Sequence, residues 1–381
     1  MAHKDRKAQV ASKTSQVHPH RVVQVELLRG AAVTAVFLFH AWSAMPEIQQ
    51  AGHLGYLLAR LASWGHLGVV VFNMLTGLVL SLPYLGPSRS NGPTYLAFLQ
   101  RRFLRILPHY WIALVLWSLV LLGSSSPPSD LWIPLLAHLL FVHTFSPATF
   151  FSIVPAYWWL GLLAQFYLVF PLLLRLFKRW GPLRSLLVTS LLCWGSWFIL
   201  HELSLHETGG MLARLDYLLY FNLPSRLPEF VAGMWLASAG SDPGKSGASE
   251  DSKLALGSCF SGKFLVCSAL ILGLLGFWVP PDQLPLHHPY LSAWCMLLVI
   301  AVLRSPLAES LGSRAWIRSL GNTSYSIYLL HQPVLTYGAM GFGLVGLSIN
   351  FWPVLFLMAA LVTLALSLGL DLLVRRTALQ G

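Results

Sequence analysis

The chain has 381 residues, of which 56% are hydrophobic and 10% charged, with a formal net charge of +11 at pH 7. Its mean hydropathy is +0.64. This composition excludes a water-soluble globule and predicts an all-α polytopic membrane bundle. The basic residues separate apolar stretches and do not gather on one polar domain with interleaved aromatics. We therefore expect a lipid bilayer as surroundings and no nucleic-acid partner.

The chain begins with residues 1–25, which are polar and basic and predict a disordered cytoplasmic tail. The apolar run from Leu27 ends without a small-x-small cleavage signal, so we expect a retained first span instead of a signal peptide. Residues 26–376 then form one integral membrane domain. A Gly/Ser-rich stretch predicts a flexible cytoplasmic loop at residues 240–262.

Stretches of about 20 apolar residues are long enough to cross roughly 30 Å of hydrocarbon. Ten such candidates follow in chain order: 27–46, 64–83, 104–123, 154–177, 185–201, 217–239, 263–280, 290–304, 317–340 and 350–373. An eleventh apolar piece begins at Asp130 and contains Pro134 and two histidines. We expect this piece to be an interfacial or re-entrant helix.

The distribution of basic residues supports this topology. With the N-terminus in the cytoplasm, ten spans place 22 of the 25 lysines and arginines inside, and only Arg60, Arg214 and Arg226 outside. Cytoplasmic loops are rich in Lys and Arg, so both termini are predicted to be cytoplasmic. The expected location is the cell membrane, as a multi-pass protein of a bacterial inner or plasma membrane.

Cysteine spacing gives no sign of a metal site. The four cysteines fall in or beside apolar segments without the paired short spacings of a zinc site. We therefore expect neither a metal nor a disulfide framework. These patterns do not predict the oligomeric state.

The first span carries two ionisable residues in the stretch "LLRGAAVTAVFLFHAW". Arg29 and His40 are eleven helical steps apart, which places them on one face, roughly 16 Å apart along the axis. A neutral imidazole near mid-membrane suits a general base. The alternatives are a packing histidine between helices and an arginine that only anchors the cytoplasmic edge.

The third span opens with a cationic cluster in "FLQRRFLRILPHYW". Arg102 and Arg105 are three apart and share a helix face, and Arg101 adds a third charge. Guanidinium groups suit bidentate contacts with phosphate oxygens. Anionic lipid binding or simple topology is the alternative.

Motifs along the chain resemble those of the membrane-bound acyltransferase family 3. They stand in the order "VELLRGAAVTAVFLFH", "GHLGVVVFNMLTGLVLS", "FLQRRFLRILPHYW", "YWWLGLLAQFYLVFPLLL", "LPSRLPEFVAGMWLA" and "LGNTSYSIYLLHQPV". The resemblance extends from about Arg21 to the tenth span. Its most specific elements are an arginine and a histidine separated by ten residues, and an R-x-x-R pair at the head of the third span.

The resemblance implies transfer of an acyl group, commonly acetyl, from cytoplasmic acyl-CoA to a hydroxyl of a glycan or other extracytoplasmic acceptor. Acyl-CoA would be the donor substrate, with no permanently bound cofactor. His40 would be the catalytic base, and Arg29, Arg102 and Arg105 would bind the donor phosphates. Direct attack by the acceptor and an acyl-histidine intermediate both remain open.

The chain departs from the family pattern at several positions. Glu26 stands where the family often has aspartate, and Val70 and Asn73 replace frequent acidic and aromatic residues. In the fourth span, Leu163 and Ala164 occupy two glutamate positions. That span offers no carboxylate to orient His40. The supporting residues of the expected site are Glu26, Asn73, Gln165, Tyr167, Arg226, Glu229, Tyr325 and His331.

The last four supporting residues lie in later spans. Arg226 and Glu229 are three apart and could pair, and a purely structural ion pair is an alternative. Tyr325, Tyr328 and His331 lie at i, i+3 and i+6 of the ninth span and could line the same cavity, whereas tyrosines near an interface are often belt residues. His66, His109, His138 and His143 are assigned no role.

Two competing interpretations belong to other functional classes. A transporter or flippase for a lipid-linked glycan would also line a path with intramembrane polar groups. A catalytically inactive relative of the family would fit the missing carboxylates of the fourth span.

Overall fold

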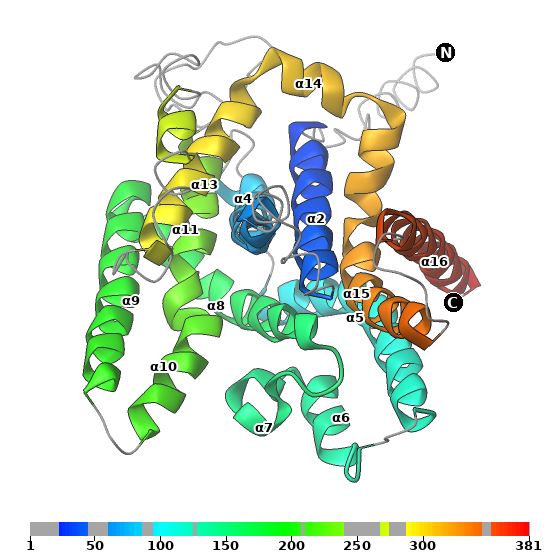
Figure 1. Ribbon diagram of the computed structural model, residues 1–381. Coiled ribbons are helices and arrows are strands. Elements are labelled where there is room, and N and C mark those ends of the chain that lie inside the picture. Colours follow the sequence, from blue (N-terminus) through cyan, green and yellow to red (C-terminus); the bar gives the residue numbers. More distant parts are fainter. Residues whose placement is uncertain are drawn as a thin grey trace, which may run out of the picture.

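The computed structural model describes residues 23–44, 60–85, 94–124, 128–206, 210–239, 267–273, 287–344 and 352–380. Within these ranges the regular elements are all helical, and no strand occurs (Figure 1). The α-helices are α2 (Val23–Ser43), α4 (Leu67–Leu85), α5 (Tyr95–Leu122), α6 (Trp132–Leu139), α7 (Pro147–Phe150), α8 (Trp158–Trp180), α9 (Pro182–Leu205), α10 (Met211–Phe221), α11 (Leu223–Ala239), α13 (His287–Arg304), α14 (Pro306–Gly312), α15 (Ala315–Leu344) and α16 (Trp352–Gln380).

Among the described residues, the helical segments long and apolar enough to cross a membrane are six: Val23–Ser43, Arg60–Leu85, Tyr95–Leu122, Pro155–Trp180, Pro182–Leu205 and Pro353–Arg376. A seventh is added if α13 and α14, which meet at a 78° bend, form one broken span. The prediction of an all-α, multi-pass membrane bundle is therefore confirmed. The count of ten spans and the cytoplasmic location of both termini stay predictions.

Some of the predicted segments fall outside the described residues. Loop 240–262 lies there entirely, as does most of the span predicted at 263–280. The tail 1–25 does so up to residue 22, and α2 begins at Val23. The expected single helix at 217–239 is instead two helices, α10 and α11, because the backbone is extended at Asn222.

The helices differ in how much of their surface the protein covers. In the span that contains α4, 72% of the most apolar window is buried, against 17% in α9 and 28% in α16. Figure 1 shows α4 near the centre of the bundle and α9 and α16 at opposite edges. Leu191 and Leu361 are exposed on these outer helices. Outward apolar faces fit a surface covered by lipid tails.

Two glycines allow helices to approach closely. A Cβ atom at Gly77 of α4 would overlap the carbonyl oxygen of Phe230 in α11. A Cβ atom at Gly321 of α15 would likewise overlap the carbonyl oxygen of Glu26 in α2. Small residues let helix backbones touch inside a membrane. The second contact lays α2 against α15 and so positions the site described below.

The piece from Asp130 does not span the bundle. Helix α6 has 8 residues, and a 3₁₀ turn and the 4-residue α7 follow it. Eight residues extend only about 12 Å at 1.5 Å per residue, which is too short to cross the hydrocarbon. In Figure 1, α6 and α7 lie at the end of the bundle opposite α14.

Candidate active site

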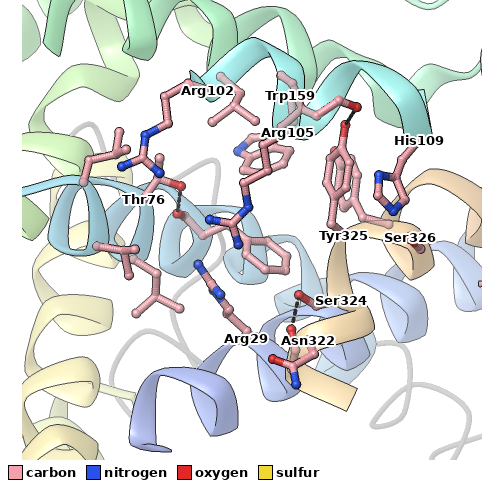
Figure 2. Close-up of a pocket in the computed structure, with 18 of the residues that line it drawn as sticks. Arg29, Thr76, Arg102, Arg105, His109, Trp159, Asn322, Ser324, Tyr325 and Ser326 are labelled. Atoms are coloured by element: carbon pink, nitrogen blue, oxygen red, sulfur yellow. Dashed lines mark hydrogen bonds between the residues drawn. The ribbon is translucent and has the colours of Figure 1, made fainter. Parts of the chain in front are cut away.

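A cavity of about 270 Å³ opens between α2, α4, α5, α8, α15 and α16. Four arginines line it: Arg29, Arg102, Arg105 and Arg375. Figure 2 shows the guanidinium groups of Arg29, Arg102 and Arg105 turned toward the same space. Three helices far apart in the chain therefore bring their positive charge to one cavity.

Helix α5 contributes its arginines from one face. Arg102 and Arg105 are three residues apart and both line the cavity, whereas Arg101 does not line it. The guanidinium carbon of Arg102 lies 5.7 Å from the centre of the Phe98 ring. His109 follows Arg105 by four residues and enters the cavity wall on the same face.

Arg29 and Glu26 lie side by side on the first turns of α2. Nη1 of Arg29 lies 3.5 Å from Oε1 of Glu26. The Glu26 side chain is 3% exposed and that of Arg29 is 23% exposed. The buried carboxylate therefore contacts the guanidinium group of an arginine that lines the cavity.

Helix α16 adds two polar residues to the wall, Asp371 and Arg375, that sequence reasoning did not assign. Nε2 of His109 lies 3.3 Å from Oδ1 of Asp371. The hydroxyl of Ser326 donates to the same carboxylate oxygen at 2.5 Å. The i, i+4 spacing of Asp371 and Arg375 in the last span was the available signal, because it places both on one face.

Aromatic rings form another part of the cavity wall. The ring centres of Trp159 and Tyr328 are 5.0 Å apart, and Phe72 lies 5.5 Å from Trp159 and 6.2 Å from Tyr328. The Tyr328 hydroxyl donates to the carbonyl oxygen of Ala156 at 2.5 Å. Tyr167 and Tyr325 also line the cavity. The cavity wall thus combines arginine side chains with a group of aromatic rings.

His40 and His331 are next to the cavity but do not line it. Their ring centres are 5.0 Å apart. The Tyr328 ring, which does line the cavity, has its centre 5.5 Å from that of His331. Tyr328 therefore connects the cavity with the histidine pair.

Asn73, Arg226 and Glu229 meet in a separate buried cluster. Nδ2 of Asn73 donates to Oε2 of Glu229 at 2.6 Å, and Nη1 of Arg226 donates to Oε1 of Glu229 at 3.3 Å. His288, which the sequence did not single out, lies with Nε2 3.1 Å from the same Oε1. The indole N–H of Trp159 donates to Oδ1 of Asn73 at 2.7 Å. The Arg226–Glu229 ion pair supports the wall of the cavity without lining it.

Gln165 also lies away from the cavity. Its Nε2 donates to Oδ1 of Asn222 at 2.6 Å, and its Oε1 accepts from the backbone N–H of Leu223 at 3.1 Å. Gln165 therefore stabilises the break between α10 and α11. Leu163, where the resemblance implies a glutamate, lines the cavity with an apolar side chain.

Metal ligands do not cluster in the part of the chain that the structure describes. No group of three or more His, Cys, Asp or Glu residues there could hold a metal ion.

Comparison with known sequences decides the family. The acyltransferase 3 family, described as an acyltransferase domain, matches residues 22–372. The chain belongs to this family. It is therefore an acyltransferase with a multi-pass membrane domain, and the resemblance drawn from the motifs is confirmed. No solved structure matches the chain.

The chain is also similar in sequence to two named acyltransferases. Acyltransferase MdmB of Streptomyces mycarofaciens is 26% identical over 343 residues, covering 84% of this chain and 81% of the relative. O-acetyltransferase OatA of Staphylococcus aureus is 25% identical over 346 residues, also covering 84% of this chain. The chain spans about half the length of OatA, with 51% covered.

Proposed function

We propose that the protein transfers an acyl group, commonly acetyl, from acyl-CoA to a hydroxyl of a glycan or other extracytoplasmic acceptor. The observation that carries the proposal is the convergence of Arg29, Arg102, Arg105 and Arg375 on one cavity beside the pair of histidine rings, His40 and His331. The similarity to a protein named O-acetyltransferase supports an oxygen acceptor and an acetyl donor.

The arginines suit the phosphates of coenzyme A. Guanidinium groups bind phosphate oxygens bidentately, and charge-assisted bonds of this kind are among the strongest in proteins. We propose that both termini face the cytoplasm, as the positive-inside bias favours, so that the arginine mouth opens toward cytoplasmic acyl-CoA. The pantetheine arm then extends inward along the cavity toward Tyr328.

His40 serves as the general base in this proposal. It takes the proton of the acceptor hydroxyl while the hydroxyl oxygen attacks the thioester carbonyl carbon. The carbon–sulfur bond breaks, and the coenzyme A thiolate takes the proton back from His40 to leave as a thiol. Because Tyr328 connects the cavity with the histidines, the thioester has to pass this ring to react. Attack by His40 itself, giving an acyl-histidine, is the second route.

The test is acyl transfer by the purified protein. We expect the protein, reconstituted with membranes of its own cells and given radiolabelled acetyl-CoA, to release free coenzyme A and to label hydroxyl-bearing material. A flippase or an inactive relative would release none. Protein carrying both Arg102→Ala and Arg105→Ala is the negative control, and Arg101→Ala is its matched partner because Arg101 does not line the cavity.

A further inference from the structure

The histidine pair lies at the contact between α2 and α15. The rings of His40 and His331 have centres 5.0 Å apart and planes inclined at 51°. His331 is completely buried, and His40 is half-buried. The other ring next to His40 is that of Phe39, at 5.0 Å, which offers no hydrogen-bond acceptor in its plane. His331 is therefore the polar ring that faces His40.

The hydrogen bond of His331 to the backbone sets its tautomer. Its Nδ1 lies 2.8 Å from the carbonyl oxygen of Tyr328. A carbonyl oxygen can only accept, so Nδ1 carries the proton and donates it to this bond. In the neutral ring, Nε2 then has a free lone pair and is an acceptor.

That acceptor is unused. Nε2 of His331 is buried and has no hydrogen-bond partner among the described residues. Buried polar atoms are nearly always hydrogen-bonded, and each exception needs an explanation. At 5.0 Å between ring centres, modest rotation brings two facing ring nitrogens to about 3 Å, the length of a hydrogen bond. Catalytic hydrogen bonds are often loose before substrate binds and tighten in the reacting complex.

Within the described residues, no ion pair joins a carboxylate to His40. Leu163 and Ala164 of α8 are apolar, and Asp371 and Glu229 contact other residues. Asp371 accepts from Ser326 and contacts His109. Glu229 is bonded within its buried cluster by Asn73 and Arg226. An intramembrane base at His40 thus needs a neutral partner to fix its tautomer.

We infer that His331 is a positioning residue for His40, accepting a hydrogen bond from one ring N–H of His40 so that the other ring nitrogen is the base. The inference rests on the proposed function. When the second nitrogen takes the hydroxyl proton, His40 becomes an imidazolium whose first N–H still donates to His331. The proton then passes to the leaving thiolate, so His331 itself gains and loses none.

The experiment compares His331→Leu with His331→Gln in purified protein supplied with radiolabelled acetyl-CoA. Leucine removes the acceptor and fills the space, so we expect kcat to fall roughly 10- to 100-fold, less than the loss for removing a general base. The KM for acetyl-CoA should stay unchanged, because His331 does not line the cavity. Glutamine offers a carbonyl oxygen and should recover most of the rate.

A double variant tests whether His331 acts through His40. In protein that already carries His40→Gln, adding His331→Leu should lower the residual rate no further, because residues that act as a unit are not additive. Equal additional loss in both backgrounds would overturn the inference and leave only a packing role for His331.

His143→Leu is the matched control for loss of a buried imidazole. His143 is also completely buried, and its Nδ1 also lacks a partner among the described residues. We expect this variant to affect protein yield but not the rate per folded molecule. If His331→Leu kept a normal kcat while His40→Gln was inactive, the positioning role of His331 would be overturned and the proposed function would stand. Full activity of His40→Gln would instead overturn the base that we propose.

Discussion

Asn73 of α4 and Glu229 of α11 meet in the interior of the bundle, with Nδ2 of Asn73 2.6 Å from Oε2 of Glu229. Glu229 is completely buried and also contacts Arg226 and His288. Because Asn73 in turn accepts from the indole N–H of Trp159, the cluster joins the core of the bundle to the cavity wall. Because Asn73, Arg226 and Glu229 do not line the cavity themselves, the stability of the cluster and donor binding can be tested separately.

The first prediction concerns this cluster. Glu229→Leu leaves Arg226 buried without its carboxylate, and breaking one side of a buried ion pair costs about 3–5 kcal/mol. We expect a clear fall in the Tm of the protein in detergent, with unchanged acetyl-CoA affinity in the folded fraction. The double variant Arg226→Leu, Glu229→Leu should lose less than the two single losses combined. Normal Tm with lost acetyl-CoA binding would show that the cluster belongs to the donor site.

The second prediction concerns the arginines of α5. Replacing Arg102 or Arg105 with alanine should raise the Kd for acetyl-CoA about ten- to hundredfold, since a charge-assisted hydrogen bond contributes about 1.5–3 kcal/mol. Lysine should recover only part of the affinity because it cannot form the bidentate fork. Arg101→Ala, measured by the same equilibrium binding, should be unaffected. If none of the three alanine substitutions changed the Kd for acetyl-CoA, the arginine cluster would serve membrane topology alone.

The third prediction concerns Arg375 of α16, which sequence reasoning did not assign to the site. Arg375 lines the cavity and its neighbour Arg376 does not, although both are exposed. Arg375→Ala should weaken acetyl-CoA binding about tenfold, as expected for one exposed phosphate contact, while Arg376→Ala should not. The effect should shrink as salt is raised, because exposed charges are screened. If Arg375→Ala and Arg376→Ala bound acetyl-CoA equally tightly, Arg375 would not belong to the donor site.

The fourth prediction concerns His40. His40→Gln keeps some hydrogen bonding but offers no usable proton acceptor, so acyl transfer should fall roughly 10²- to 10⁴-fold. Acetyl-CoA affinity should be unchanged, because His40 does not line the cavity. The measurement is coenzyme A release at matched protein levels. Near-normal turnover would make His40 a packing histidine.

The fifth prediction concerns the stacked rings of His138 and His143, whose centres are 3.9 Å apart. Both are buried outside the candidate spans, and burial lowers the pKa of His143 from 6.5 to about 4 and that of His138 to about 2. Between pH 6.5 and 4 the unfolded chain binds more protons than the folded one, so stability should fall as pH falls.

For His143 alone this loss amounts to about 3 kcal/mol across the window. Thermal unfolding in detergent at a series of pH values measures it. His143→Leu should be less stable at pH 7 yet show a shallower decline toward pH 4. A variant with the same slope as the natural protein would show that other groups cause the acid sensitivity.

Local periodicity was enough to predict part of this molecule. Span-length apolar runs determine that the chain enters a membrane as helices. Spacing of three and of eleven residues places Arg102 with Arg105, and Arg29 with His40, on common faces, because neighbours on a helix surface are set by the turn alone. The family follows from the same short motifs.

Tertiary structure decided which faces meet. Only the packing of α15 against α2 brings His331 to His40, and only the approach of α16 to α5 brings Asp371 and Arg375 to His109 and the arginines. The packing of α8 against α10 and α11 pairs Gln165 with Asn222 at the break between those two helices. These pairings join residues separated by long stretches of chain. They depend on how side chains and glycines fit between whole helices, which no local pattern encodes.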